Sequence, residues 1–235
     1  MLVLATSAEQ FASVFLQACL VILLLFGPTR RYFVILGYSL LYLFTSVTEV
    51  LVARYLGRKS ALYHQVYWVD EILLDLLLFF MVIWLAYRAT EDPASPVRGL
   101  RKLLLVAAIV AIALPLLSSA PLLSPRWYRF ASQVLNFGGT LLNMGLWMAL
   151  IASKKRDPQL MLVSTGLGIA VTGQAIYYGA VLLTNQVFLK IIADQLNVLT
   201  HILGVAIWCY AFRPSTRKSK PSNVSATGSP IVSSA

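Results

Sequence analysis

Runs of apolar residues dominate the chain, and most are as long as a helix that crosses a lipid bilayer. Such a helix needs about 20 residues to span roughly 30 Å of hydrocarbon. The pattern predicts seven of them, at 10–26, 32–54, 66–88, 101–123, 127–152, 158–183 and 187–212. Pro115 and Pro121 interrupt the fourth run, so that helix should kink or end early. We therefore expect an all-α bundle of seven transmembrane helices that forms one domain, residues 1–212.

The polar segments between the runs predict how the bundle lies in the membrane. Lys and Arg are more than twice as numerous after the first, third, fifth and seventh runs as in the remaining segments. Basic residues gather on the cytoplasmic side of membranes, so the amino terminus should lie outside and the carboxyl terminus in the cytoplasm. The first run lacks a basic flank and a cleavage site of small residues. We expect it to be a retained helix and not a signal peptide.

The segment 213–235 is rich in Ser, Pro and Lys and contains almost nothing to bury. It is predicted to be a disordered, basic cytoplasmic tail.

Composition supports a membrane protein, since 59% of the residues are hydrophobic and the charged ones are 19 Lys and Arg and 9 Asp and Glu. The net charge of +10 would suggest a nucleic-acid partner in a soluble protein. Here the excess falls on the predicted cytoplasmic face, where it holds helix ends against anionic lipid. We expect the lipid bilayer as the partner, no nucleic acid, and a multi-pass location in the inner membrane of a bacterium.

Five of the predicted helices carry polar residues at helical spacing, whereas 10–26 and 101–123 are almost entirely apolar. Intervals of three and four residues place side chains on one face of a helix. The stripes are Ser39, Tyr42, Ser46 and Glu49; Asp70, Glu71 and Asp75; Gln133, Asn136, Thr140 and Asn143; Thr172, Gln174, Tyr177 and Tyr178; and Lys190, Asp194, Asn197 and His201. An ionisable group inside a membrane costs on the order of 3 kcal/mol, so it needs a partner, a wet cavity or a function.

At a rise of about 1.5 Å per residue, most of these polar residues fall in the outer half of the membrane. The sequence therefore predicts an outward-facing polar pocket bounded by the five striped helices. The candidate pocket residues are Glu49, Glu71, Asp75, Asn136, Thr140, Gln174, Asp194, Asn197 and His201. A hydrogen bond to His201 from Asp75 or Glu49 would set the protonation of this histidine and make the pocket sensitive to pH.

A purely structural interpretation of the same residues stays open. Asn136 and Thr140 are residue types that join membrane helices by hydrogen bonds without any ligand. Lys190 and Asp194 lie one turn apart, so they could neutralise each other. Carboxylates near a helix end, such as Glu49, could simply be solvated.

Known chemistries of seven-helix proteins fit poorly. A retinal protein needs a lysine near the middle of its last helix, but Lys190 lies within a turn of the outer end. Zinc hydrolases of the ceramidase and adiponectin-receptor kind need three histidines, and this chain has His64 and His201 only. The single dipeptide Pro158-Gln159 falls short of the two copies typical of PQ-loop transporters. We expect no metal site and no cofactor, and we assign no catalytic residue.

Three segments carry a resemblance to a known family. They are YHQVYWVDEILLDLLLFFMVIWLAYRA (63–89), FASQVLNFGGTLLNMGLW (130–147) and LNVLTHILGVAIWCY (196–210). In these segments the chain resembles a family of uncharacterised seven-helix membrane proteins common in soil Acidobacteria, and the similarity spans most of 10–212. No activity is attached to that family, so the resemblance implies only the fold and the location in a membrane.

The expected function is that of a receptor-like or sensory membrane module. It would bind a small extracytoplasmic ligand and pass the signal to a separate cytoplasmic signalling protein. Two alternatives stay open: a small proton-coupled transporter, and an intramembrane hydrolase that uses Asp75 and His201.

Overall fold

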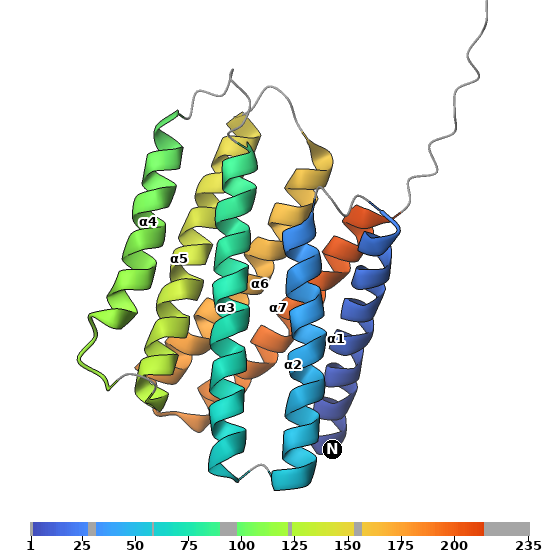
Figure 1. Cartoon of the computed structure of the whole chain (residues 1–235), viewed down its shortest axis with the longest axis vertical. Coiled ribbons are helices and arrows are strands. Elements are labelled where there is room, and N and C mark those ends of the chain that lie inside the picture. The colour runs from blue at the N-terminus through green and yellow to red at the C-terminus, as the bar shows by residue number, and fades with distance from the viewer. Residues whose placement is uncertain are drawn as a thin grey trace, which may run out of the picture.

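The computed structural model of the chain describes residues 2–27, 32–57, 59–89, 98–121, 124–152 and 157–213, and these ranges form seven α-helices (Figure 1). The helices are α1 (Leu2–Leu25), α2 (Phe33–Leu56), α3 (Ala61–Ala89), α4 (Arg98–Leu116), α5 (Pro125–Ala152), α6 (Pro158–Leu183) and α7 (Val187–Phe212). The prediction of an all-α fold is therefore confirmed. Within the predicted tail only Arg213 belongs to the described residues.

The fourth helix ends early, as its prolines predict. It stops at Leu116, one residue after Pro115. Trp127, at the start of α5, donates a hydrogen bond from its indole Nε1 to the carbonyl oxygen of Pro115 over 2.8 Å. The backbone N–H of Ser118 donates to the same oxygen over 3.3 Å, so a carbonyl group in the last turn of α4 has two partners.

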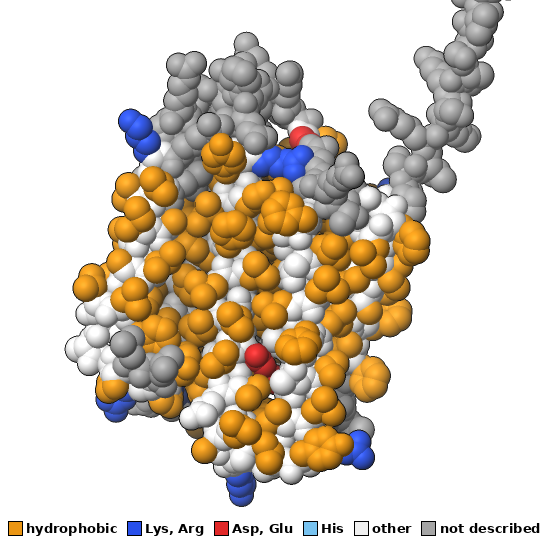
Figure 2. Space-filling view, viewed as in Figure 1, with side chains coloured by type: hydrophobic (Ala, Val, Ile, Leu, Met, Phe, Trp, Pro, Cys, Tyr) orange, Lys and Arg blue, Asp and Glu red, His pale blue; other side chains and the backbone are white. Residues whose placement is uncertain are grey.

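Three helices, α2, α6 and α7, are long and apolar enough to cross a membrane. Shorter apolar stretches, Phe11–Leu25 and Leu105–Leu116, lie within α1 and α4. Apolar side chains cover the face of the bundle shown in Figure 2, and Lys and Arg gather at its two ends. Large exposed apolar areas mark contact with lipid or with other proteins. The chain is thus a membrane protein.

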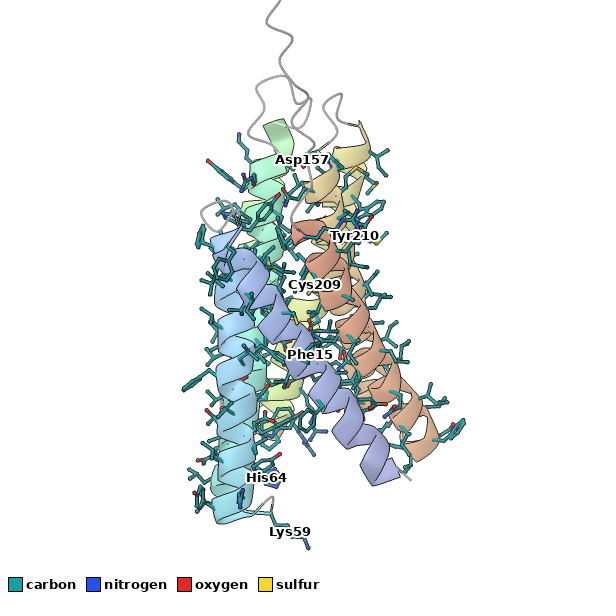
Figure 3. The ribbon with its side chains drawn as sticks, turned by 90° about the vertical axis from the view of Figure 1, so that its right-hand side faces the viewer. Phe15, Lys59, His64, Asp157, Cys209 and Tyr210 are labelled. Atoms are coloured by element: carbon teal, nitrogen blue, oxygen red, sulfur yellow. The ribbon has the colours of Figure 1, made fainter. Side chains whose placement is uncertain are left out.

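The helices pack antiparallel to their neighbours in the chain (Figure 1). The helix α1 packs against α2 and α7, α2 also packs against α3, and α6 packs against α7 and α3. The helix α5 packs against α3 and α6, and α4 lies at the periphery against α5. The start of α1 and the connections α2–α3, α4–α5 and α6–α7 lie at one end, which we name the N-terminal end; the other is the C-terminal end. Figure 3 shows Lys59 and His64 at the N-terminal end and Asp157 and Tyr210 toward the C-terminal end.

The backbones of α6 and α7 meet where the two helices cross. The carbonyl oxygen of Gly204 lies 2.7 Å from the point where a Cβ atom on Gly166 would stand, and the carbonyl oxygen of Gly166 lies 2.6 Å from the corresponding point on Gly204. Beside this crossing, the indole Nε1 of Trp208 donates a hydrogen bond to the carbonyl oxygen of Val163 over 2.9 Å. Glycine on both helices therefore permits contact between their backbones.

Large side chains fill the C-terminal half of the bundle. Tyr32 packs edge-on against Phe212 with ring centroids 4.9 Å apart, and Trp208 is 1% exposed. Toward the N-terminal end the ribbons of α1 and α2 spread apart, as Figure 3 shows. The polar cavity described below lies on this side of the bundle.

Replacing Gly166 or Gly204 by valine should separate α6 from α7, because the new side chain has no room. We expect each variant to lose about 1–3 kcal/mol of stability, measured as a lower midpoint of thermal unfolding in detergent. Gly179→Val is the matched control, since nothing lies within 4 Å of the Cβ position of Gly179 on the same helix α6. An equal loss of stability in the control would contradict the explanation.

Candidate functional site

A cavity of about 310 Å³ opens from near the N-terminal end of the bundle to its middle, and we name it the polar cavity. At about 1.5 Å per residue, its walls extend from roughly 10 to 25 Å below the helix ends. Five helices supply the lining residues: Glu9 and Ser13 of α1; Tyr38 and Tyr42 of α2; Glu71 and Leu74 of α3; Gln174 of α6; and Asp194, Gln195, Asn197, Val198 and His201 of α7. Its volume is at the lower end of the range of small-molecule sites.

One wall of the polar cavity is a chain of contacts that joins α1, α2 and α7. The hydroxyl groups of Ser13 and Tyr42 lie 2.7 Å apart, which is a hydrogen bond. The ring of Tyr42 stacks on that of His201 with centroids 4.9 Å apart and an angle of 20° between the planes. Nε2 of Gln17 lies 3.4 Å from Nε2 of His201. His201 is thus held between a stacked ring and an amide.

The opposite wall is acidic. Tyr178 donates a hydrogen bond from its hydroxyl group to Oε1 of Glu71 over 2.5 Å, and this bond joins α6 to α3. Asp70 and Asp194 lie near enough to Glu71 for their charges to repel its carboxylate. The expected ion pair between Lys190 and Asp194 is not formed within the described part of the chain. No Lys or Arg is among the described residues that line the cavity, so the carboxyl groups of this wall have no Lys or Arg partner there.

Of the nine residues that the sequence predicts for a pocket, the structure brings five together around the polar cavity: Glu71, Gln174, Asp194, Asn197 and His201. They come from α3, α6 and α7. That they bind a ligand stays a prediction.

Glu49 lies beside the polar cavity but does not line it. Its carboxyl group is close enough to Glu71 and Asp70 to interact with both through space. Figure 2 shows acidic side chains at the surface between α2 and α3, in the lower half of an otherwise apolar face. The acidic region thus extends from the cavity wall toward the surface.

Asp75 and Asn136 are buried between α3 and α5. Neither lines the polar cavity, although Asp75 lies within electrostatic range of Glu71 and Tyr38, which do. The Asp75 side chain is 1% exposed, and the side chains of Ser132 and Asn136 lie next to it. Neither carboxyl oxygen of Asp75 has a hydrogen-bond partner within the described ranges. The expected hydrogen bond between Asp75 and His201 is therefore absent there, because Asp75 faces α5 while His201 contacts α1 and α2.

Thr140 and Asn136 use their hydrogen bonds within their own helix. The Thr140 hydroxyl donates to the carbonyl oxygen of Asn136 over 2.9 Å, and the Asn136 amide donates to that of Ser132 over 2.9 Å. Thr140 lines a separate groove of about 590 Å³ between α5, α6 and α7, which is mostly apolar and includes Met144, Trp147, Met148 and Ile151. The polar stripe of α5 is thus not part of the polar cavity.

The helix α1 lines the polar cavity, where α5 was expected. Glu9 and Ser13 line the polar cavity, and Gln17 holds its histidine. Sequence reasoning missed this helix because its apolar residues outnumber the polar ones. The signal was present nonetheless, since these three residues follow each other at intervals of four and so share one face.

Comparison of the chain with protein-family models, with curated proteins and with solved structures finds no match. The resemblance to the acidobacterial family stays a prediction, and the argument about function depends on the geometry of the site.

Tyr178→Phe should destabilise the bundle, because it removes the donor that faces the Glu71 carboxylate. A hydrogen bond to a charged group contributes about 1.5–3 kcal/mol, so the midpoint of thermal unfolding in detergent should fall accordingly. Tyr177→Phe removes the same atom one position earlier, where the hydroxyl group makes no hydrogen bond to the described residues. The contribution assigned to the bond between Tyr178 and Glu71 is wrong if the two variants unfold alike.

Proposed function

We propose that all seven helices span the inner membrane of a bacterium, with the N-terminal end outside and the C-terminal end in the cytoplasm. The helices contain 19 to 29 residues, which corresponds to roughly 28–44 Å, enough to cross the hydrocarbon region. The excess of Lys and Arg on the C-terminal side supports this orientation. The polar cavity then extends from the extracytoplasmic half of the membrane to its midplane.

Labelling with a membrane-impermeant maleimide tests the orientation. In a chain with Cys19 and Cys209 replaced by serine, a cysteine at Lys59 should react in intact spheroplasts. A cysteine at Arg213, at the other end, should react only after the membrane is permeabilised. Both residues are exposed and lie at opposite ends of the bundle. The reverse pattern would overturn the proposed orientation.

The function that this geometry supports best is a receptor-like sensory module that binds a small extracytoplasmic ligand. The observation that carries the proposal is a cavity lined by polar residues from five helices. The helices around it have no break at its depth. Transporter sites are typically formed by discontinuous helices near the midplane of the membrane.

A series of contacts leads from the polar cavity toward the cytoplasmic end. Tyr38 lines the cavity and packs edge-on against Trp208, with ring centroids 5.9 Å apart. Trp208 in turn packs at the crossing of α6 and α7, where Gly166 and Gly204 touch. A ligand that moves Tyr38 would also move Trp208 and so favour one arrangement of α6 against α7. A separate cytoplasmic signalling protein would respond to that arrangement.

A small proton-coupled transporter is the second candidate, and Asp75 favours it. A carboxyl group buried among membrane-spanning helices is typical of proton relays, and Asp75 is 1% exposed. An intramembrane hydrolase gains no such support, because the described contacts of Asp75 and His201 share no residue.

Reactivity of a cysteine in the cavity wall tests whether the cavity opens to the outside. Asn197→Cys should react in spheroplasts with a small, impermeant methanethiosulfonate. Asn136→Cys, the same substitution at a site that is 2% exposed, should not react. Compounds that slow the reaction at Asn197→Cys are then offered in radiolabelled form to proteoliposomes with an imposed proton gradient. A receptor would not accumulate them, whereas uptake that a protonophore abolishes would establish the transporter.

A further inference from the structure

The polar cavity presents negative charge and oxygen acceptors to any ligand. Among the lining residues the carboxylates are those of Glu9, Glu71 and Asp194, and no Lys or Arg lines the cavity in the described part of the chain. Asp70 and Asp194 both act on Glu71 through space. An anionic ligand would meet repulsion here, and a cation would be attracted.

Oxygen atoms without partners point to a ligand that donates hydrogen bonds or carries positive charge. Oε1 of Gln174 and Oδ1 of Asn197 are both buried and accept no hydrogen bond within the described ranges, and both residues line the cavity. Tyr38, which also lines the cavity, is 1% exposed, and its hydroxyl group has no hydrogen-bond partner among the described residues. Buried polar groups in folded proteins are nearly always satisfied. The side chains of Gln174, Asn197 and Tyr38 therefore have unused hydrogen-bonding capacity at the cavity wall, for a ligand or water to take up.

Aromatic rings distinguish an organic cation from a metal ion. Tyr38 and Tyr42 both line the cavity, and their ring centroids lie 6.3 Å apart. Organic ammonium ions bind over the faces of aromatic rings, next to carboxylates. The described His, Cys, Asp and Glu residues form no group of three or more that could hold a metal ion.

We propose that the polar cavity binds a small organic ammonium ion, a protonated amine or a quaternary ammonium compound, between the carboxylates of Glu71 and Asp194 and the rings of Tyr38 and Tyr42. The inference rests on the proposed function of the cavity as a ligand pocket and specifies the class of ligand. Gln174 and Asn197 supply neutral acceptors.

Pairs of compounds that differ only in charge provide the test. The probes are choline and butylammonium. Their neutral counterparts are 3,3-dimethylbutan-1-ol, in which carbon replaces the choline nitrogen, and pentane. The purified full-length protein should unfold at a higher temperature with at least one ammonium ion, and the same ion should protect Asn197→Cys from the thiol reagent. The neutral partner should do neither at the same concentration.

A second measurement does not depend on which ammonium ion is chosen. Asn197→Cys should react about tenfold faster with a trimethylammonium methanethiosulfonate than with a sulfonate methanethiosulfonate of similar size, after correction for their rates with a free thiol. Asp194→Asn and Glu71→Gln should each reduce this ratio several-fold. Asp194 is exposed, so its variant is expected to fold even where Glu71→Gln does not. The matched control is Asp157→Asn at the C-terminal end, where Asp157 caps α6 and asparagine is an equally good cap.

The outcomes separate this inference from the proposed function. A thiol at Asn197→Cys that no reagent reaches from outside would overturn the ligand pocket itself. A reactive thiol with equal rates for both reagents, and with no advantage of ammonium ions over their neutral partners, would overturn only the assignment of a cation. A rate ratio that changes equally in Asp157→Asn would do the same, because the effect would then be general and not that of the cavity.

Discussion

The contact between the backbones of α6 and α7 determines how the rest of the bundle is arranged. Because Gly166 and Gly204 lack side chains, the two helices meet closely enough for Trp208 to reach the carbonyl oxygen of Val163 across the crossing. The large side chains of the C-terminal half then pack around this fixed pair. With α7 held against α6, and α1 packed on α7, the side of α7 that carries Asn197 and His201 faces α2 and α3.

The membrane adds a second constraint, since polar side chains inside hydrocarbon need partners. In this bundle the residues of α5 and those around the polar cavity meet that need differently. In α5, Asn136 and Thr140 bond to carbonyl groups of their own helix, and the Ser164 hydroxyl donates to Asn143 over 3.1 Å, which joins α6 to α5. Around the polar cavity several acceptors have no described partner. Ser132 and Gln133 of α5 also have side-chain oxygen atoms without a described partner, so the cavity differs from the α5 stripe chiefly in the space that it encloses between five helices.

The helices could be predicted from the sequence because the length of an apolar run is a local property. The end of α4 near Pro115 could be predicted for the same reason, since a proline in the interior of a helix removes a backbone hydrogen bond. Which helices are neighbours could not be predicted in this way. Periodicity shows that a helix has a polar face but not what that face meets, so α5 was expected at the cavity and α1 was not.

Glu71 and Asp75 show that residue spacing alone does not predict which side chains share a site. Glu71 and Asp75 are one turn apart on α3, and the sequence groups them on one stripe. A turn of four residues also rotates a side chain by about 40°, which here suffices to direct Asp75 toward α5 while Glu71 lines the cavity. The sequence also does not show which polar side chains bond within their own helix, as Thr140 does. Such a bond joins residues four apart, which is the same interval that places residues on one face of a helix.

The apolar groove between α5, α6 and α7 has a consequence for how the protein is handled. A groove of about 590 Å³ that is lined by Met144, Met148 and Ile151 cannot stay empty next to lipid. In a bilayer that spans the bundle, an acyl chain would fill it and make the contacts that a side chain makes elsewhere. The annular lipid at this site would then be a component of the packed protein, and short-chain detergents that strip it away would loosen α5 from α6.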